Sequence, residues 1–369
     1  MSRVLVLVIA VVAATAAATS LRAVSLNTLC VDDSFADGWG TVGEMARRDA
    51  LVASGNYTDA SARQFLSSTR FQRVAGFLRT LQTTHNALFL QEVDVPSVVD
   101  GGEHLLKYFA IESAGPWRVA CMVAGSAEME MILVNTDEIK VVTNASIDNG
   151  PVLGCSAQVF LGGHAKPITL MTVHMRASAI RNPATLNDTL QRFMDVMPQD
   201  TSTVIVGGDL NVHIPDLVDR FARLDNRSWD YRTAENTTGM MGFTTQHEAN
   251  FVGAYDGFVT RNYDSSTTSF DRTELYLQGF MPKYLGNGTH GASAFQYADG
   301  PYPSIEGNLN FNHHDLGKRN WANGSLSDHV AVSSSFFNDD EGRVAFFYYL
   351  KLLGTLVSKL LFAASPNSN

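Results

Sequence analysis

Cysteine is scarce in this chain: three occur among 369 residues. So few cysteines exclude a small scaffold held together by several disulfides, and no cluster of cysteine and histidine has the spacing of a zinc site. One disulfide, with Cys121 and Cys155 as the favoured pair, would leave Cys30 free. Three buried thiols are the alternative interpretation of the same residues.

Positive charge is scarce too. Lysine and arginine together number 27 against 37 aspartates and glutamates, so the formal net charge is −10. Such a chain gains little from non-specific attraction to phosphate polyanions, which excludes a nucleic-acid binder held by a broad basic surface but not a local basic or metal-filled cleft. The chain also lacks a G-x-S-x-G elbow and a GxxxxGK[ST] loop, which disfavours serine-hydrolase and P-loop chemistry.

The N-terminus has the pattern of a secretory signal peptide. Arg3 precedes a long apolar run, and small residues follow it between Ala16 and Ser20, so we expect residues 1–20 to be removed. An uncleaved anchor or a buried strand is the alternative. Seven N-x-S/T sequons agree with a glycosylated lumenal or secreted protein. They begin at Asn56, Asn144, Asn187, Asn226, Asn236, Asn287 and Asn323.

The C-terminus, residues 341–369, holds a second apolar segment at 344–364, which is long enough to span a bilayer. Lys351 and Lys359 oppose insertion about as strongly as the apolar residues favour it. A transmembrane anchor, a helix lying in the membrane interface and a helix docked on the protein all remain open. Between the two ends, 45% hydrophobic residues over the whole chain suffice for one large domain, which we place at 21–340.

Strands and helices alternate in this central part, which predicts a layered α/β domain. The expected strands are 22–30, 86–93, 129–135, 155–161, 167–175, 202–211, 254–260 and 328–337, and the expected helices are 60–82 and 184–197.

Polar side chains recur where these apolar runs begin or end. For any one of them, a turn former or a strand-end hydrogen bonder is the better interpretation. The whole succession indicates more, because strands that are neighbours in one sheet would bring their polar ends into one cleft. The residues are Asn27, Glu92, His174, Asp209, Asn211, Asp256, Asp328 and His329.

These residue types predict a chemistry. Carboxylate and amide oxygens are hard ligands that suit Mg²⁺, with Mn²⁺ as a substitute, and Mg²⁺ commonly shares its site with a substrate phosphate. Two histidines suit proton transfer and the stabilisation of phosphoryl charge near neutral pH. A carboxylate such as Asp256 can orient an imidazole.

In this order, six short motifs resemble the endonuclease/exonuclease/phosphatase superfamily, which includes deoxyribonucleases and neutral sphingomyelinases. They are "SLNTL", "LQEV", "VHM", "GGDLN", "YDGFV" and "LSDHVAV", and they cover roughly residues 22–337. The resemblance implies an α/β fold, a four-layer sandwich of two packed mixed β-sheets flanked by helices. It also implies metal-dependent hydrolysis of a phosphoester.

The resemblance assigns a role to each residue. Glu92 would be the main Mg²⁺ ligand with Asn27 beside it, and Asp328 would lie close to metal and phosphate. Asp209 would orient or deprotonate the attacking water, and Asn211 would hold a phosphate oxygen. Two histidines would flank the scissile phosphate, and an aspartate would orient the second of them: these are His174, His329 and Asp256.

Some features depart from the deoxyribonuclease branch. Glu128 is the candidate for the acid that supports the first histidine there, but the stretch 151–160 lacks the arginine of that branch. Together with the acidic charge and the segment 344–364, this favours a lipid phosphodiester as substrate. A secreted deoxyribonuclease-like nuclease and a non-catalytic binding protein are the alternatives. Residues 257–327 would either cover the cleft or form a glycosylated surface loop, and no protein partner is implied.

Overall fold

The computed structural model describes residues 20–28, 42–94, 115–125, 128–162, 164–180, 182–200, 202–232, 255–263, 273–276 and 331–337. Several predictions from the sequence lie outside these residues. They concern the signal peptide, the segment 344–364, Cys30, Asp328, His329 and most of the insertion 257–327. Within the described part, no helix is long and apolar enough to cross a membrane.

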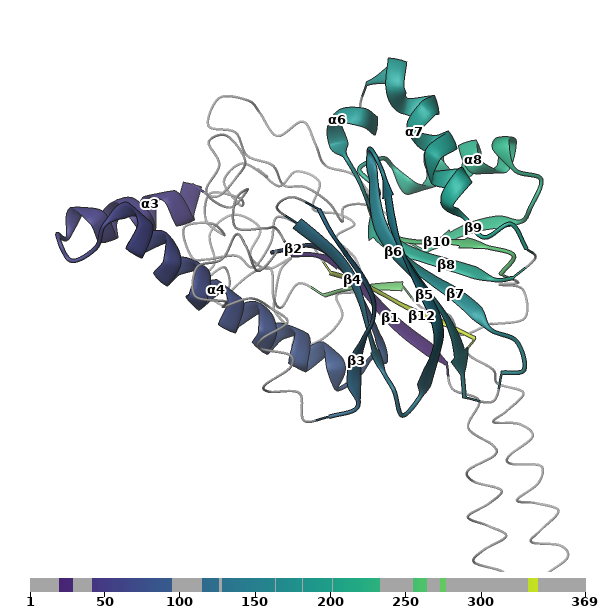
Figure 1. Cartoon of the computed structure of the whole chain (residues 1–369), viewed down its shortest axis with the longest axis horizontal. Helices are drawn as coiled ribbons and strands as arrows, with labels where there is room; N and C mark the ends of the chain where they lie inside the picture. The colour runs from purple at the N-terminus through teal and green to yellow at the C-terminus, as the bar shows by residue number, and fades with distance from the viewer. Residues whose placement is uncertain are drawn as a thin grey trace, which may run out of the picture.

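Two six-stranded sheets pack face to face (Figure 1). In each sheet one pair of neighbours is parallel, β1 with β2 and β7 with β8, and the other pairs are antiparallel. The first sheet has the order β11 (Thr273–Tyr276), β12 (Ala331–Phe336), β1 (Leu21–Asn27), β2 (Ala87–Asp94), β4 (Glu128–Asn135), β3 (Trp117–Ala124). The second has the order β5 (Ile139–Asn149), β6 (Val152–Leu161), β7 (Ile168–Met175), β8 (Val204–Asp209), β10 (Asp256–Arg261), β9 (Trp229–Arg232).

Helices form the two outer layers. The helix α4 (Asp59–Gln82) begins at a capping box between Thr58 and Ser61 and packs on the outer face of the first sheet. On the second sheet, α7 and α8 bury a shared apolar face, where the rings of Phe193 and Phe221 stack at 4.9 Å between centroids. The remaining bounds are α3 (Val42–Ala53), α6 (Ala177–Ile180), α7 (Pro183–Val196) and α8 (Ile214–Leu224).

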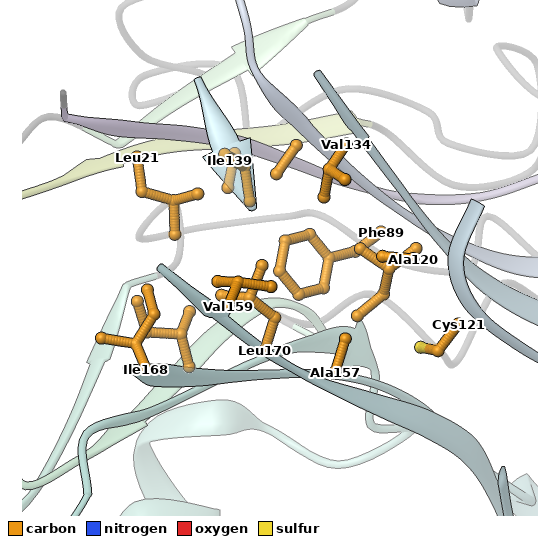
Figure 2. Packing of buried hydrophobic residues seen from close by; sticks show 14 of the residues in the cluster. Leu21, Phe89, Ala120, Cys121, Val134, Ile139, Ala157, Val159, Ile168 and Leu170 are labelled. Atoms are coloured by element: carbon orange, nitrogen blue, oxygen red, sulfur yellow. The ribbon is translucent and has the colours of Figure 1, made fainter. Parts of the chain in front are cut away.

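The layer between the sheets is apolar over most of its depth (Figure 2). Phe89 of the first sheet meets Phe258 of the second edge to face, with ring centroids 5.5 Å apart. Gly207 allows this contact, because a Cβ atom there would lie 2.8 Å from the Phe89 ring. A disulfide between Cys121 of β3 and Cys155 of β6 also joins the two sheets.

The predicted fold class is confirmed: the layers are helix, mixed sheet, mixed sheet, helix. Every strand and helix expected from the sequence is present within a few residues of its expected bounds. One assumption was wrong. The strands that carry the polar residues are not neighbours in one sheet, because β1, β2 and β12 belong to the first sheet and β7, β8 and β10 to the second.

Candidate metal and phosphate site

The inner faces of the two sheets turn from apolar to polar at one end of the sandwich. Alternate residues of a strand point to the same face, so each inward series can be followed from the core to the site. On β7 the series runs from Leu170 through Thr172 to His174, and on β1 it ends at Ser25 and Asn27. The site therefore forms where two opposed sheets present polar ends to each other.

A neutral layer separates this polar end from the core. Gln91 of β2 donates from Nε2 to Oγ1 of Thr172 across the gap between the sheets, at 2.8 Å. Ser25 donates to Oε1 of the same Gln91 at 3.4 Å. Buried amides and hydroxyls need such partners. The bond between Gln91 and Thr172 links the two sheets directly beneath the charged groups, and Ser25 orients the Gln91 amide.

Glu92 reaches the site through a break in strand geometry. Strict alternation would place it on the outer face with Leu88 and Leu90, against α4. Instead its φ is 52°, and the pairing of β2 with β4 shifts between Leu90 and Val93. Such a left-handed residue in a bulge costs about 1 kcal/mol or more and redirects a side chain. Here it turns the Glu92 carboxylate inward.

Asn27 joins the two principal carboxylates. Its Nδ2 atom donates to Oε1 of Glu92 at 2.7 Å and to Oδ2 of Asp209 at 3.1 Å, and the side chain is fully buried. The amide nitrogen therefore faces the carboxylates. The predicted role of Asn27 as an oxygen ligand requires a rotation of its amide by about 180°, which exchanges oxygen for nitrogen.

Asp209 and Asn211 form a fixed pair at the end of β8. The backbone N–H of Asn211 donates to Oδ1 of Asp209 at 2.9 Å, and its Nδ2 donates to Oδ2 at 3.1 Å. Asn211 has a φ of 51°, so the chain turns left-handed immediately after the strand. Its Nδ2 also lies 2.9 Å from the carbonyl of Met175 and 3.3 Å from Nε2 of His174.

His174 is surrounded by carboxylates. Its Nδ1 lies 3.4 Å from Glu128 and 3.7 Å from Glu130, and its Nε2 lies 3.5 Å from Glu92 and 3.8 Å from Asp209. Burial by itself would lower the pKa of His174. The carboxylates of Glu128 and Glu130 beside Nδ1, with the attraction of the other two acids, outweigh burial and raise the pKa well above its usual value. The ring is thus held as a hydrogen-bond donor.

The two glutamates of β4 differ in exposure. Burial opposes ionisation of Glu128, but its hydrogen bond and attraction to His174 prevail and lower its pKa. Burial prevails for Glu130 and raises its pKa to about 7, despite the nearby His174 ring. Glu128 was predicted from the sequence, whereas Glu130 was not. The spacing of two in "EMEM" was a usable signal, since it puts both carboxylates on one face of a strand.

The donor set fits a hard divalent cation. Ligand atoms of Glu92, Glu128 and His174 all lie within 4.8 Å of one another, and with His174 protonated the two carboxylates remain as ligands. With Asp209 and Asn27 beside them, the oxygens outnumber the imidazole nitrogens, as Mg²⁺ or Mn²⁺ favours. One divalent ion would also offset part of the negative charge that is gathered and buried here.

The structure brings together five of the predicted site residues: Asn27, Glu92, His174, Asp209 and Asn211. Asp256 is fully buried and pairs in register with Asp209 in the adjacent strand, so it lies at the same end of the second sheet. Its proposed partner His329, and Asp328, lie outside the described residues. Their roles stay predictions of the sequence.

Comparison with known proteins finds similarity only among solved structures, since no protein-family model and no curated protein matches the chain. A humanized TDP2 of D. rerio is 15% identical, with a TM-score of 0.45 over 86% of this chain and 98% of that chain. TDP2 from C. elegans is 16% identical, with a TM-score of 0.45, and the match covers 86% of this chain and 75% of that chain. An endonuclease/exonuclease/phosphatase from Bacteroides vulgatus is 12% identical, with a TM-score of 0.45, and the match covers 86% of this chain and 98% of that chain. Structures of the superfamily that the motifs resemble are thus among those that match this chain.

Proposed function

We propose that this protein is a divalent-metal-dependent phosphoester hydrolase in which water attacks a phosphodiester. The observation that carries the proposal is the meeting of two hard carboxylates, two amides and a histidine at one end of the sandwich. They are Glu92, Asp209, Asn27, Asn211 and His174. A non-catalytic binding protein has no evident need for both a metal-type acid pair and a histidine held as a donor.

The metal would be held by Glu92, with Asn27 beside it once its amide is rotated. When bound, it would supply charge that stabilises the phosphoryl oxygens. The chain's own groups do the rest. Asp209, fixed by Asn211 and Asn27, accepts the proton of the attacking water. As the new P–O bond forms, the bond to the leaving oxygen breaks.

His174 and Asn211 would act on the phosphate. Nε2 of His174 lies 3.3 Å from Nδ2 of Asn211. The two hydrogens of Nδ2 point to Asp209 and to the carbonyl of Met175, so Asn211 would hold a phosphate oxygen after its amide reorients. Their hydrogen bonds become stronger as negative charge develops in the transition state, which is how such donors accelerate a reaction. The sequence assigns His329, on the other side of the phosphate, the same kind of role, with protonation of the leaving oxygen shared between the two histidines.

Metal dependence is the first test. The purified protein should hydrolyse a phosphodiester with Mg²⁺ or Mn²⁺ and lose all activity in EDTA, and Glu92→Gln should lose metal affinity as well as rate. Glu138→Gln is the matched control, since Glu138 pairs with Arg22 away from the site and should keep full activity. Full activity in chelator would refute the mechanism.

The substrate class is the finer part of the proposal. The net charge, the segment 344–364 and the missing arginine favour a lipid phosphodiester, as in sphingomyelinase-like members of the superfamily. A nuclease is the alternative. Sphingomyelin in mixed micelles, plasmid DNA and inositol phosphates, assayed in parallel with Mg²⁺, separate the two. Faster turnover of DNA than of lipid would reverse the order.

Entry into the secretory pathway is proposed on the signal-like N-terminus and the sequons. The Cys121–Cys155 disulfide supports it, because disulfides persist mainly in oxidising compartments. The protein made in a eukaryotic host should shift in size with an N-glycosidase and lack its first ~16–20 residues. Washing membranes with alkaline carbonate then separates a spanning C-terminal helix, which stays in the pellet, from an interfacial one. An unglycosylated protein with an intact N-terminus would contradict the proposal.

A further inference from the structure

Glu130 is a fully buried carboxylate beside the site, and it is not among the residues whose ligand atoms gather for a metal. Its side chain is fully buried, and neither oxygen makes a hydrogen bond of ordinary length and direction. Two groups approach it: Nδ1 of His174 at 3.7 Å, and the backbone N–H of Glu92. One carboxylate from β4 thus contacts both the proposed metal ligand and the histidine.

Such a side chain costs stability. Burying a carboxylate away from water without good partners lowers the stability of the folded protein. Replacing it with an apolar or neutral residue of similar volume often makes the protein more stable. The same inner face of β4 carries Ile132 and Val134 in the next positions, which shows what the layer between the sheets otherwise accepts. Proteins keep features of this kind mainly where function needs them.

Glu128 does not make Glu130 redundant. Its side chain is 18% exposed, whereas that of Glu130 is closed to solvent. Water can compete for Glu128 and leave Nδ1 of His174 without a fixed partner. Glu130 contacts the same nitrogen from the closed side and also lies against the bulge that turns Glu92 inward.

We propose that Glu130 is a positioning residue for the phosphoesterase site. It fixes His174 from its Nδ1 side, so that Nε2 faces Asn211, and it fixes the backbone that presents Glu92. The inference rests on the proposed function, because it assigns Glu130 to the machinery of that reaction. Glu130 itself touches neither metal nor substrate.

The test compares Glu130→Gln and Glu130→Leu with Glu128→Gln and with the double glutamine variant. We expect kcat to fall about 10-fold in each Glu130 variant, the usual scale for a group that orients an active residue, with KM little changed. The melting temperature should stay the same or rise by about 2 °C, because a buried carboxylate has been removed. A merely structural residue would give the reverse, a lower melting temperature with kcat retained in the folded fraction.

The double variant sharpens the test. If both carboxylates hold the same nitrogen, the double variant should lose more activity than the product of the two single losses. Losses that multiply independently, a fall in melting temperature for both Glu130 variants, or unchanged kcat would each overturn the proposal. So would a second equivalent of tightly bound Mn²⁺ that disappears in Glu130→Gln, since Glu130 would then be a ligand.

A readout without turnover separates this proposal from the proposed function. In protein labelled with ¹⁵N-histidine, the Nδ1 resonance of His174, identified by its loss in His174→Gln, should report a strongly bonded N–H that weakens in Glu130→Gln. If no phosphoester is cleaved but this resonance changes as expected, the proposed function fails and the positioning role survives. An unchanged resonance overturns the positioning role whatever the activity.

Discussion

Two buried histidines stand near the two ends of β2 and behave in opposite ways. His174 is at the end where β2 reaches Glu92, and His85 comes just before the strand begins. Both are less than a tenth exposed. The pKa of His174 is raised well above its usual value, whereas burial lowers that of His85 to about 4, with Arg22 adding to the effect.

The difference lies in the neighbours. Nδ1 of His85 lies 3.0 Å from the carbonyl of Leu81, and its Nε2 lies 2.8 Å from the hydroxyl of Ser333. These neutral partners satisfy an uncharged ring: Nδ1–H donates to the carbonyl, and Nε2 accepts from the hydroxyl. His174 meets four carboxylates instead. Burial therefore penalises charge on both rings, and the sign of the surrounding charge decides which ring stays ionised.

The largest expected effect separates the histidines by activity. His174→Ala should lower kcat by about 10²-fold or more, because it removes the donor that faces the phosphate. His85→Gln should leave kcat within about 2-fold, since His85 lies away from the site. Steady-state kinetics on the best substrate, at saturating Mg²⁺, measure both. Equal losses in the two variants would show that the site does not depend on His174 in particular.

The next effect separates them by pH. The pKa of His85 is about 4 in the folded protein and near 6.5 when unfolded, so the unfolded chain takes up the proton first as the pH falls. The stabilisation is complete above about pH 6.5 and is lost towards pH 4, by roughly 2 kcal/mol at pH 5. Urea unfolding at several pH values should show a smaller loss in His85→Gln. Identical pH dependence in both proteins would mean that His85 is not buried as a neutral ring.

The smallest effect concerns the charge next to His85. Arg22 pairs with Glu138 at 3.0 Å, and both side chains are partly exposed. Arg22→Met should cost about 0.5 kcal/mol of stability, the usual value of such a pair. It should also raise the pKa of His85 slightly, because a nearby positive charge is lost. NMR titration of the His85 ring checks the direction, and a fall in that pKa would contradict the assigned cause.

Much of the fold could be predicted because its signals are local. Alternating apolar strands and the helix 59–82 follow from periodicity, and Pro183 after the capping Asn182 marks the start of α7. Several elements were missed, among them the half-buried strand β3 and the helix α8, although the apolar residues of α8 recur at helical spacing. β5 is largely exposed and polar, as befits a strand at a sheet edge, and the short strands β9 and β11 depend on their neighbours.

By itself, the sequence identified several residues that the structure brings together, because an acid, amide or histidine at the end of an apolar strand is visible in one dimension. That holds for Asn27, His174 and Asp209. Only the tertiary structure decided that these ends face one another from two sheets, that a left-handed Glu92 turns inward, and that Glu130 is buried against His174. The physical reason is the separation along the chain of the residues that set each property. Periodicity is set by neighbours along the chain, whereas burial and charge at the site depend on residues brought close by packing.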